Sequence, residues 1–468
     1  MSDYSMTIGG QAVSGTDSFA VLNPATGDIT ARAPECTREE LDRAMAAGLQ
    51  AQDGWQADPA ARRAGLAALA DAIEADIAGL ALLITVEQGK PLHESRSEVA
   101  DAIGDLRYFA GVQLEPARVG GRHPAVSVIR RPVGPVAAIT PWNFPLGTVI
   151  AKVAPGLAAG CTMIVKPSPH TPLAALRLGE LARGILPAGV LNVISGSNEV
   201  GAWMTSHPVP RMVSFTGSIA TGKRIAAAAA PDLKRVTLEL GGNDPAIVLD
   251  DVSVGDVAGA VFDNAFSNCG QVCVAVKRVF VPEHMHADFV EALAERARVA
   301  KVGDGQNEDT EVGPLCNQMQ FDRVSELVSD AVRAGAKVAA GGRPAGGPGY
   351  FFEPTVLSGI GDETRIVAEE QFGPAIPVLP YRDVADAVRR ANGTHFGLGA
   401  SVWTSDPERG AALAPSIESG TVWVNTHQSA VPGQPFGGLK WSGIGVEGGT
   451  WGLEAFTDVQ VVHVRDRA

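Results

Sequence analysis

Short apolar segments that alternate with helical segments are the feature of this chain that most restricts its fold. Five of them lie between residues 134 and 240, at 134–140, 161–166, 191–194, 211–215 and 235–240. Short, nearly continuous apolar runs are typical of strands buried on both faces, as in a parallel sheet covered by helices. The pattern therefore predicts an α/β fold built around a parallel sheet.

Helical patterns fill the N-terminal part of the chain. Thr37 and Glu40 have the spacing of a capping box, which predicts a helix from there to about Gly48. Apolar residues three and four apart predict further helices at 58–83 and 99–110. These helices carry no motif, so we expect them to be packing surface.

A second α/β unit is expected after residue 275. Its predicted elements are a strand at 278–281, helices at 286–298 and 319–334, and a strand at 337–340. In the first unit, the helix after 161–166 is expected to begin with Thr171 as its N-cap and Pro172 in its first turn.

The composition restricts the class of partner. The 468 residues include 38 Lys and Arg against 52 Asp and Glu, so the net charge is −14. This acidity argues against nucleic acid or an anionic membrane surface as the main partner. The first residues lack the charged and apolar regions of a leader, and we find no run of about 18 apolar residues. A cytoplasmic enzyme is the expectation.

Cysteine spacing indicates neither a disulfide framework nor a metal site. The five cysteines, at 36, 161, 269, 273 and 316, are odd in number and irregularly spaced. No second Cys or His pair follows Cys269 and Cys273 at metal-ligand spacing, so no metal is expected. A reversible disulfide between Cys269 and Cys273 under oxidation is a hypothesis only.

Three residues have the chemistry that an acyl-forming reaction requires. Cys273 follows a Gly-Gln turn, which can expose both its sulfur and its backbone N–H, and an electropositive setting would favour its thiolate. Glu239 precedes a pair of glycines and is a candidate base, while Asn143 lies in a turn that two prolines stiffen and two aromatics shield. Taken locally, Glu239 is equally a strand-edge charge, and the turn is equally a proline-rich turn with a core Trp.

Three further segments contain candidate cofactor residues, and two of them lie where ligands of an open α/β sheet bind. Lys166 ends an apolar strand, and Gly217, Ser218 and Gly222 lie in a strand–turn–helix whose backbone N–H groups can hold phosphate. Glu370 lies in an acidic turn. On local sequence alone, these are also a solvated strand-end charge, a plain strand-to-helix turn and a surface turn.

Seven short motifs occur together along the chain: PWNFP, IVKPSPHTP, FTGS, LELGG, FSNCGQVC, EEQFGP and PFGGLKWSG. In this order and at these intervals they resemble the aldehyde dehydrogenase superfamily, from about residue 20 to the C-terminus.

The resemblance implies a Rossmann-type cofactor domain, an α/β catalytic domain and a β arm for oligomerisation. The expected boundaries are 1–113 and 134–240 for the dinucleotide-binding domain, 241–440 for the catalytic domain, and 114–133 and 452–468 for the arm. The arm implies a homodimer or homotetramer.

The resemblance also implies a nicotinamide cofactor. The positions that match its cofactor contacts are Trp142, Lys166, Gly217, Ser218, Gly222, Glu370 and Phe372. Pro169 stands where many NAD-preferring relatives carry a glutamate that binds the ribose hydroxyls and repels a 2′-phosphate. Its absence weakens discrimination against NADP, and NAD remains the expected cofactor.

The implied reaction is oxidation of an aldehyde to its carboxylic acid. The Cys273 thiolate attacks the aldehyde, and the Asn143 amide and the Cys273 N–H hold the oxyanion. Hydride passes to the nicotinamide, and Glu239 activates the water that hydrolyses the thioester. CoA-acylating semialdehyde dehydrogenases usually lack this glutamate; they stay an alternative, as do a hydrolase or acyltransferase without nicotinamide and a non-enzymatic structural protein on the same fold.

The expected substrate tunnel includes Phe144, Gly147, Ala151 and Ser267. Succinic-semialdehyde relatives carry an arginine at the position of Ala151, so a dicarboxylic semialdehyde would lose its usual anchor here. The small side chains at 147 and 267 leave width for a bulky aliphatic or aromatic aldehyde.

Overall fold

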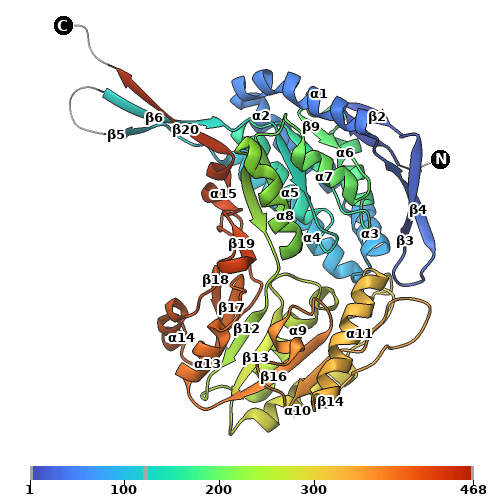
Figure 1. Ribbon diagram of the computed structural model, residues 1–468, viewed down its shortest axis with the longest axis vertical. Helices are drawn as coiled ribbons and strands as arrows, with labels where there is room; N and C mark the ends of the chain where they lie inside the picture. Colours follow the sequence, from blue (N-terminus) through green and yellow to red (C-terminus); the bar gives the residue numbers. More distant parts are fainter. Residues whose placement is uncertain (1–3, 120–124, 465–468) are drawn as a thin grey trace.

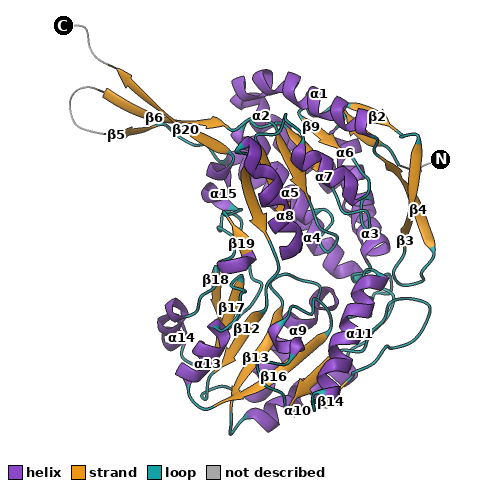
Figure 2. Cartoon of the chain, viewed as in Figure 1, coloured by secondary structure: helices purple, strands orange, loops and turns teal. Residues whose placement is uncertain are grey.

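Two large β-sheets, one in each half of the molecule, organise the protein in a computed structural model that describes residues 4–119 and 125–464 (Figure 1). The predicted α/β fold is confirmed. Helices lie against both sheets, and a narrow three-stranded sheet projects away from the body beside the C-terminus (Figure 2). Residues 120–124 and 465–468 of the expected arm lie outside the described residues.

The first sheet has eight strands in the order β19-β11-β10-β7-β8-β9-β1-β2. Its five central strands are mutually parallel, and they are β7 (Val136–Ile139), β8 (Met163–Lys166), β9 (Leu191–Val193), β10 (Met212–Thr216) and β11 (Arg235–Glu239). Antiparallel strands close its edges, namely β1 (Met6–Ile8), β2 (Gln11–Val13) and β19 (Gly443–Ile444). The five apolar segments thus form one sheet, whose central strands are buried.

Helices α5 (Gly147–Ala159), α6 (Leu173–Ala182), α7 (Asn198–Ser206) and α8 (Ile219–Ala229) connect these parallel strands. Four N-terminal helices pack around them: α1 (Arg38–Ala57), α2 (Pro59–Ala75), α3 (Ile77–Gln88) and α4 (Leu92–Gly111). The capping box of Thr37 and Glu40 is present, but α1 continues well past Gly48.

Two local predictions were wrong. The predicted helix 58–83 is two helices, because the chain leaves helical geometry at Asp76, whose carboxylate accepts from Arg177 of α6 at 2.7 Å. Thr171 does not cap α6; its hydroxyl donates to the Trp142 carbonyl, and the buried Glu87 carboxylate accepts from the first N–H groups of the helix instead. A cap supplied by a distant residue leaves no local signal in the sequence.

The second sheet has the order β14-β15-β16-β13-β12-β17-β18. Its parallel strands are β12 (Asp244–Val248), β13 (Val276–Pro282), β15 (Thr355–Ser358), β16 (Ala375–Tyr381), β17 (Gly399–Trp403) and β18 (Thr421–Val424), and β14 (Lys337–Ala340) is an antiparallel edge. The associated helices are α9 (Val254–Phe266), α10 (His286–Val299), α11 (Gln318–Arg333), α12 (Arg365–Ala368), α13 (Val384–Asn392) and α14 (Pro407–Leu413). The elements predicted for this unit are present within two residues at each end.

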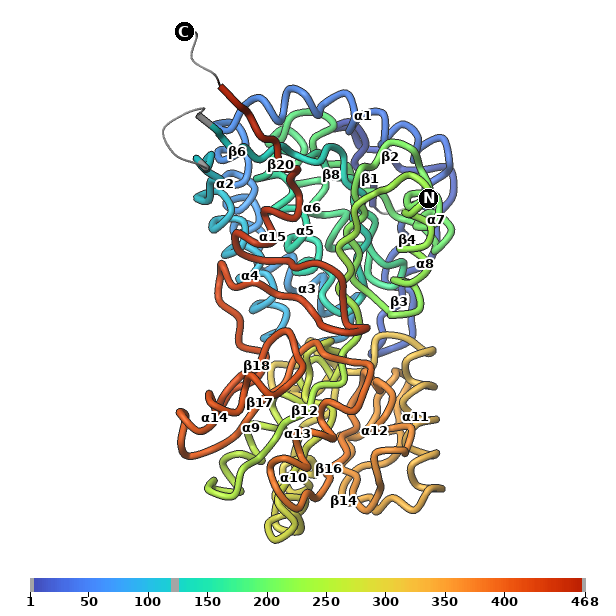
Figure 3. Tube along the Cα trace, turned by 60° about the vertical axis from the view of Figure 1, so that its left-hand side comes forward, coloured from blue at the N-terminus to red at the C-terminus, as the bar shows by residue number. Residues whose placement is uncertain are grey.

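After β18 the chain returns to the first half through β19 and α15 (Gly449–Ala455), and it ends in β20 (Thr457–Val464) (Figure 3). Strand β20 pairs with β6 (Ala125–Pro132), which pairs with β5 (Ala117–Val119), and these strands form the projecting sheet. A separate hairpin joins β3 (Asp17–Leu22) to β4 (Ile29–Glu35).

Each large sheet has its own apolar core, and a third, small apolar cluster surrounds Cys273. No described helix combines the length and the apolar character needed to cross a membrane.

Candidate active site

A cavity of about 260 Å³ lies where the carboxyl ends of strands β7, β10 and β11 face the loop before β13. Asn143 and Cys273, which are 130 positions apart in the sequence, both line it. Its other lining residues are Pro141, Trp142, Phe144, Thr148, Thr216, Gly217, Ser218, Leu240, Gly241, Met319, Gln320, Arg323, Glu370, Gln371 and Phe372. Several of the sequence motifs therefore meet at one place, the carboxyl edge where ligands of parallel sheets bind.

The loop that carries Cys273 is held in an unusual backbone conformation. Asn268 and Cys269 both have left-handed backbone angles, with φ of 47° and 57°. The Asn268 N–H donates to both carboxylate oxygens of the half-buried Glu94, at 3.0 and 2.9 Å, and the Asn268 side chain donates to the Asn143 carbonyl at 2.9 Å. Side chains that lie far away in the sequence thus hold a backbone that few residues adopt unaided.

Asn143 is buried, and its amide has one defined partner. Its Nδ2 donates to the Gln271 carbonyl at 2.9 Å. A primary amide has two N–H groups, so this bond orients the second one, which stays available for a ligand in the cavity. Beside it, the rings of Trp142 and Phe372 pack edge to face with centroids 5.4 Å apart.

The Cys273 thiol lies in a more acidic setting than the sequence predicted. Its pKa is raised to about 12, mainly by burial; Lys277 lowers the pKa, whereas Asp244, Glu370 and Glu239 raise it. In this state Cys273 is a neutral thiol at physiological pH. An electropositive setting would favour the thiolate, whereas three of the four charged residues that affect this thiol are acidic.

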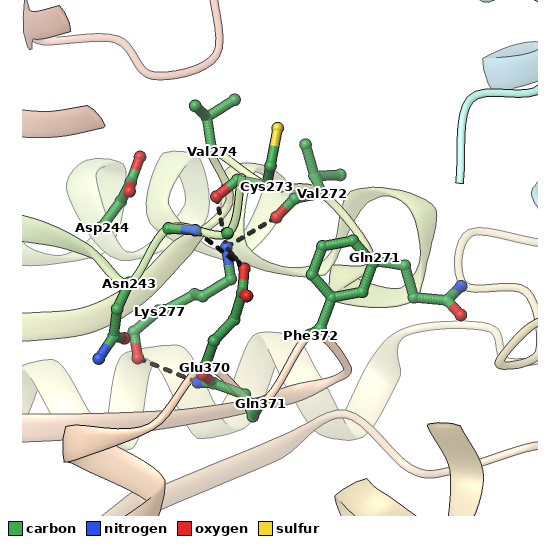
Figure 4. Close-up of polar contacts among 12 residues, drawn as sticks. Asn243, Asp244, Gln271, Val272, Cys273, Val274, Lys277, Glu370, Gln371 and Phe372 are labelled. Carbon is green, nitrogen blue, oxygen red and sulfur yellow. Dashed lines mark hydrogen bonds and ion pairs between the residues drawn. The ribbon is translucent and has the colours of Figure 1, made fainter. Parts of the chain in front are cut away.

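The one cation in that group, Lys277, lies directly behind the nucleophile (Figure 4). Its buried ammonium donates to the carbonyls of Val272 and Cys273, both at 2.7 Å, and lies 3.5 Å from Oε1 of Glu370. Oε1 of Glu370 also accepts from the Gly242 N–H at 3.1 Å. Sequence analysis missed Lys277; the signal was a lysine in β13, whose only charged residues are Lys277 and Arg278.

Glu239 ends β11 next to this cavity, but its carboxylate is buried and, within the described part of the chain, neither oxygen has a hydrogen-bond partner. Burial raises its pKa well above the usual carboxyl range, the negative Glu447 raises the pKa further, and Lys152 opposes both. The environment of Glu239 therefore favours its protonated form in this conformation. The two glycines that follow Glu239 are closely packed. A Cβ on Gly241 would collide with the Glu370 carboxylate, and a Cβ on Gly242 would collide with the Cys273 carbonyl.

Lys152 and Glu447 form a buried ion pair close to Glu239, and Ser214 donates to the same Glu447 oxygen at 3.3 Å. Sequence analysis missed both residues of the pair. A lysine inside the apolar helix α5 was a signal that it must find a partner. Its partner lies 295 positions away, so the pairing itself was beyond sequence reasoning.

The cofactor candidates lie on neighbouring strand ends. Gly217 follows β10, and a Cβ there would meet the Phe215 ring at 2.5 Å. Ser218 is the N-cap of α8, its hydroxyl accepts from the Thr221 N–H, and it lines the cavity. Gly222 packs against Leu240, which lines the cavity. Lys166 ends β8, which pairs with β7, and burial lowers the pKa of its ammonium to about 8. Small residues, a helix N-terminus and a buried cation fit a phosphate-bearing dinucleotide.

The substrate candidates are spread over a wider area. Phe144 lines the cavity, and the Lys90 ammonium lies 3.7 Å from its ring centroid. Gly147 and Ala151 lie on α5 near Thr148, which lines the cavity, and the Gly147 N–H donates to Glu98 at 2.9 Å. Ser267 lines a different hollow, of about 280 Å³.

An apolar wall closes the other side of the nucleophile. Its buried members are Val272, Val274, Ala275, Leu398 and Trp423, and Phe144 and Phe436 pack against them. Among the described residues, no group of three or more His, Cys, Asp or Glu side chains has the arrangement of a metal site.

Residues 12–462 match the aldehyde dehydrogenase family. The chain therefore belongs to this family and is an NAD(P)-dependent aldehyde dehydrogenase, which oxidises an aldehyde to its carboxylic acid.

Among its relatives are a probable NADP-dependent succinate-semialdehyde dehydrogenase of Sinorhizobium fredii, 37% identical over 95% of this chain and 92% of the relative, and human retinaldehyde dehydrogenase 3, 39% identical over 96% of this chain and 90% of the relative. Among solved structures, an NAD+ complex of aldehyde dehydrogenase from Bacillus cereus has a TM-score of 0.97 and 36% identity, over 99% of this chain and 97% of that one.

Proposed function

We propose that this dehydrogenase works through a covalent intermediate on Cys273, with Asn143 and Glu239 in separate roles. The observation that carries the proposal is the convergence at one cavity: the Asn143 amide and the Cys273 thiol both line it, and Glu239 lies close enough to affect the pKa of that thiol. Attack of sulfur on the aldehyde carbon forms a thiohemiacetal.

The oxyanion of this intermediate is stabilised by the free N–H of the Asn143 amide and by the Cys273 backbone N–H. Because Gln271 already holds one N–H of the amide, the second is oriented before the substrate arrives. Donors fixed in this way contribute more to the rate than donors that must reorganise. The chemistry that a bound nicotinamide dinucleotide supplies is acceptance of the hydride, which leaves a thioester on Cys273.

Glu239 acts as the base for hydrolysis of this thioester. Its raised pKa gives it a high affinity for the proton of the attacking water, but it must first lose its own proton. The buried Lys152 and Glu447 are close enough to act on the Glu239 charge, and we assign them the passage of that proton away from the site.

The dinucleotide is held by residues of the first sheet and by two residues of the second half. Gly217, Ser218 and Gly222, at the N-terminus of α8, would hold its phosphates, and Lys166 lies one strand further along the sheet edge. Glu370 would bind the ribose next to the nicotinamide, and Phe372 and Trp142 would pack beside the ring, since all three line the cavity. Pro169 provides no carboxylate against a 2′-phosphate, so both NAD and NADP are accepted, with NAD preferred.

The proposed domain boundaries are 1–113 with 134–240 for dinucleotide binding, 241–440 for catalysis, and 114–133 with 452–468 for the arm. The exposed apolar side chains of Val459, Val461 and Val464 on the projecting β20 support a second copy of the chain as the arm's partner. We propose a homodimer or homotetramer.

The substrate that this site favours is an apolar aldehyde. The cluster of side chains packed against Cys273 is apolar, and the nearby Asp244 and Glu370 would repel a second carboxylate on the substrate. Ala151 provides no cation to offset this repulsion. Succinate semialdehyde, which the name of one relative gives as its substrate, is therefore expected to be a poor substrate here.

The test follows the absorbance of reduced cofactor across aliphatic, aromatic and dicarboxylic aldehydes, with NAD and NADP in parallel and Cys273→Ala as the control. Free acid as product is expected. A product that forms only with CoA would favour the CoA-acylating alternative, and faster turnover of succinate semialdehyde than of hexanal or benzaldehyde would contradict the substrate proposal.

A further inference from the structure

Lys277 is the feature near the active site that the reaction scheme leaves without a role. Its ammonium is buried and has three polar neighbours: the Val272 and Cys273 carbonyls, each at 2.7 Å, and Oε1 of Glu370 at 3.5 Å (Figure 4). Two of these neighbours belong to the nucleophile and the residue before it, and the third belongs to the cavity wall. One ammonium therefore connects the nucleophile loop to the cavity wall.

The three contacts differ in how easily they can change. The Val272 and Cys273 carbonyls are part of a loop fixed by the Glu94 and Asn268 contacts. The Glu370 side chain is 19% exposed, lines the cavity and is anchored by a single backbone N–H, that of Gly242. Only the contact with Glu370 is open to a ligand that enters the cavity.

We propose that Lys277 is a positioning residue that couples the dinucleotide site to the Cys273 thiol: in the free protein Glu370 neutralises its ammonium, and when a bound dinucleotide draws Glu370 away, the ammonium acts on the sulfur. This rests on the proposed function, which assigns Glu370 to the ribose of the dinucleotide. The nucleophile is then activated only when the hydride acceptor is present.

The charges around the thiol give this coupling a definite direction. Lys277, Asp244, Glu370 and Glu239 all affect the pKa of the Cys273 thiol, and Lys277 is the only cation among them. Removing the Glu370 charge from the neighbourhood of Lys277 lowers the pKa of the thiol in two ways, because one carboxylate leaves and one ammonium is no longer neutralised. The fixed carbonyl contacts keep Lys277 in place while Glu370 moves.

The test measures the rate at which iodoacetamide alkylates Cys273 between pH 6 and 10, without dinucleotide and with saturating NAD+ or NADP+. In the wild-type chain, dinucleotide is expected to speed alkylation at pH 7.5 by about tenfold, as one unit of thiol pKa implies. Lys277→Met should lose most of this gain, and Lys277→Arg should retain it. The positive nicotinamide ring acts equally on wild type and Lys277→Met, so the difference between them isolates the lysine.

Glu370→Gln provides the sharper result because it needs no dinucleotide. The isosteric amide keeps the contact with the Gly242 N–H but leaves Lys277 unneutralised, so alkylation of the free variant should already be about tenfold faster than that of the free wild type. The matched control is Glu369→Gln, since Glu369 is paired with Arg323 and Arg365 instead. Cys273→Ala gives the background from the four other cysteines.

Two outcomes would overturn the coupling: a free Glu370→Gln variant that alkylates at the wild-type rate, or a folded Lys277→Met variant that keeps the full gain with dinucleotide. Turnover of aldehyde by the wild-type chain is measured in parallel. If turnover fails, the proposed function is wrong; if turnover is normal and the alkylation rates do not differ, only the role of Lys277 is wrong.

Discussion

Two buried lysine–carboxylate pairs flank the reacting groups, and they differ in their access to the cavity. Lys152 and Glu447, with side-chain exposures of 0% and 9%, lie behind Glu239 in the first half of the molecule. Lys277 and Glu370, with exposures of 2% and 19%, lie behind Cys273 in the second half. Both pairs set the charge that a catalytic side chain experiences, and they use the same residue types to do so.

The difference in access separates what the two pairs can do. The two partners of an enclosed pair stay together whether or not a ligand occupies the cavity. Such a pair can shift the pKa of a neighbouring group or pass on a proton, but it cannot respond to ligand binding. A pair with one carboxylate at the cavity wall can lose that partner to a ligand. Residue type alone does not distinguish a fixed pair from a responsive one; the exposure of one carboxylate does.

The largest effect is expected from Cys273→Ala, which removes the thiol whose pKa Lys277 and Glu370 affect. Aldehyde oxidation should fall by a factor on the order of 10⁴ or more, because no covalent intermediate can form. Dinucleotide binding, followed by quenching of tryptophan fluorescence, should persist. Oxidation within tenfold of wild type would contradict the assignment of the nucleophile.

Glu239→Gln removes the carboxylate whose pKa the Lys152–Glu447 pair affects. Turnover should fall by about 10²–10⁴, as for loss of a general base, while a rapid burst of reduced cofactor remains because the thioester still forms.

In the wild type, the rate of thioester hydrolysis should rise with pH through a pKa above the usual carboxyl range, since only deprotonated Glu239 acts as a base and burial raises its pKa. Lys152→Met should move that rise to still higher pH, because Lys152 lowers the pKa of Glu239. If Glu239→Gln also lost the burst of reduced cofactor, Glu239 would act at or before hydride transfer, which would contradict its assignment to thioester hydrolysis.

Asn143→Ala removes a group that belongs to neither pair. We expect turnover to fall by about 10²–10³, the cost of one oxyanion donor. The alkylation rate of Cys273 should change little, since no charge near the sulfur is altered. A change in alkylation as large as that of Glu370→Gln would mean that Asn143 acts on the thiol and not on the oxyanion.

The sequence predicted the parallel strands and the candidate residues at their ends, because both are local. Buried parallel strands appear as apolar runs, and Cys273, Asn143 and Glu239 lie in short motifs that do not depend on distant partners. The helix break at Asp76 and the capping of α6 by Glu87 were not predictable, since each depends on a residue from another helix.

The electrostatics of the site were predicted least well. A reactive thiol needs an electropositive or dipolar setting, but the sequence does not show that the fold brings Asp244, Glu239 and Glu370 close enough to raise the pKa of Cys273. Buried charge depends on which distant segments meet, and the 295 positions between Lys152 and Glu447 illustrate the distance involved. A lysine in an apolar segment signals that a partner exists, but it does not say which residue that partner is.

The smallest effects, on stability, sharpen the comparison between the two pairs. Glu447→Gln should lower the free energy of unfolding by about 3 kcal/mol, because it leaves the enclosed Lys152 ammonium without its opposite charge. Glu370→Gln should cost only about 1 kcal/mol, because Lys277 keeps two carbonyl acceptors and the carboxylate it loses was partly hydrated. Urea unfolding followed by circular dichroism measures both, with Asp309→Asn as the control, since Asp309 pairs with Lys301 at the exposed surface. Equal losses for the two variants would mean that the second pair is as enclosed as the first, and a ligand could then not separate Glu370 from Lys277.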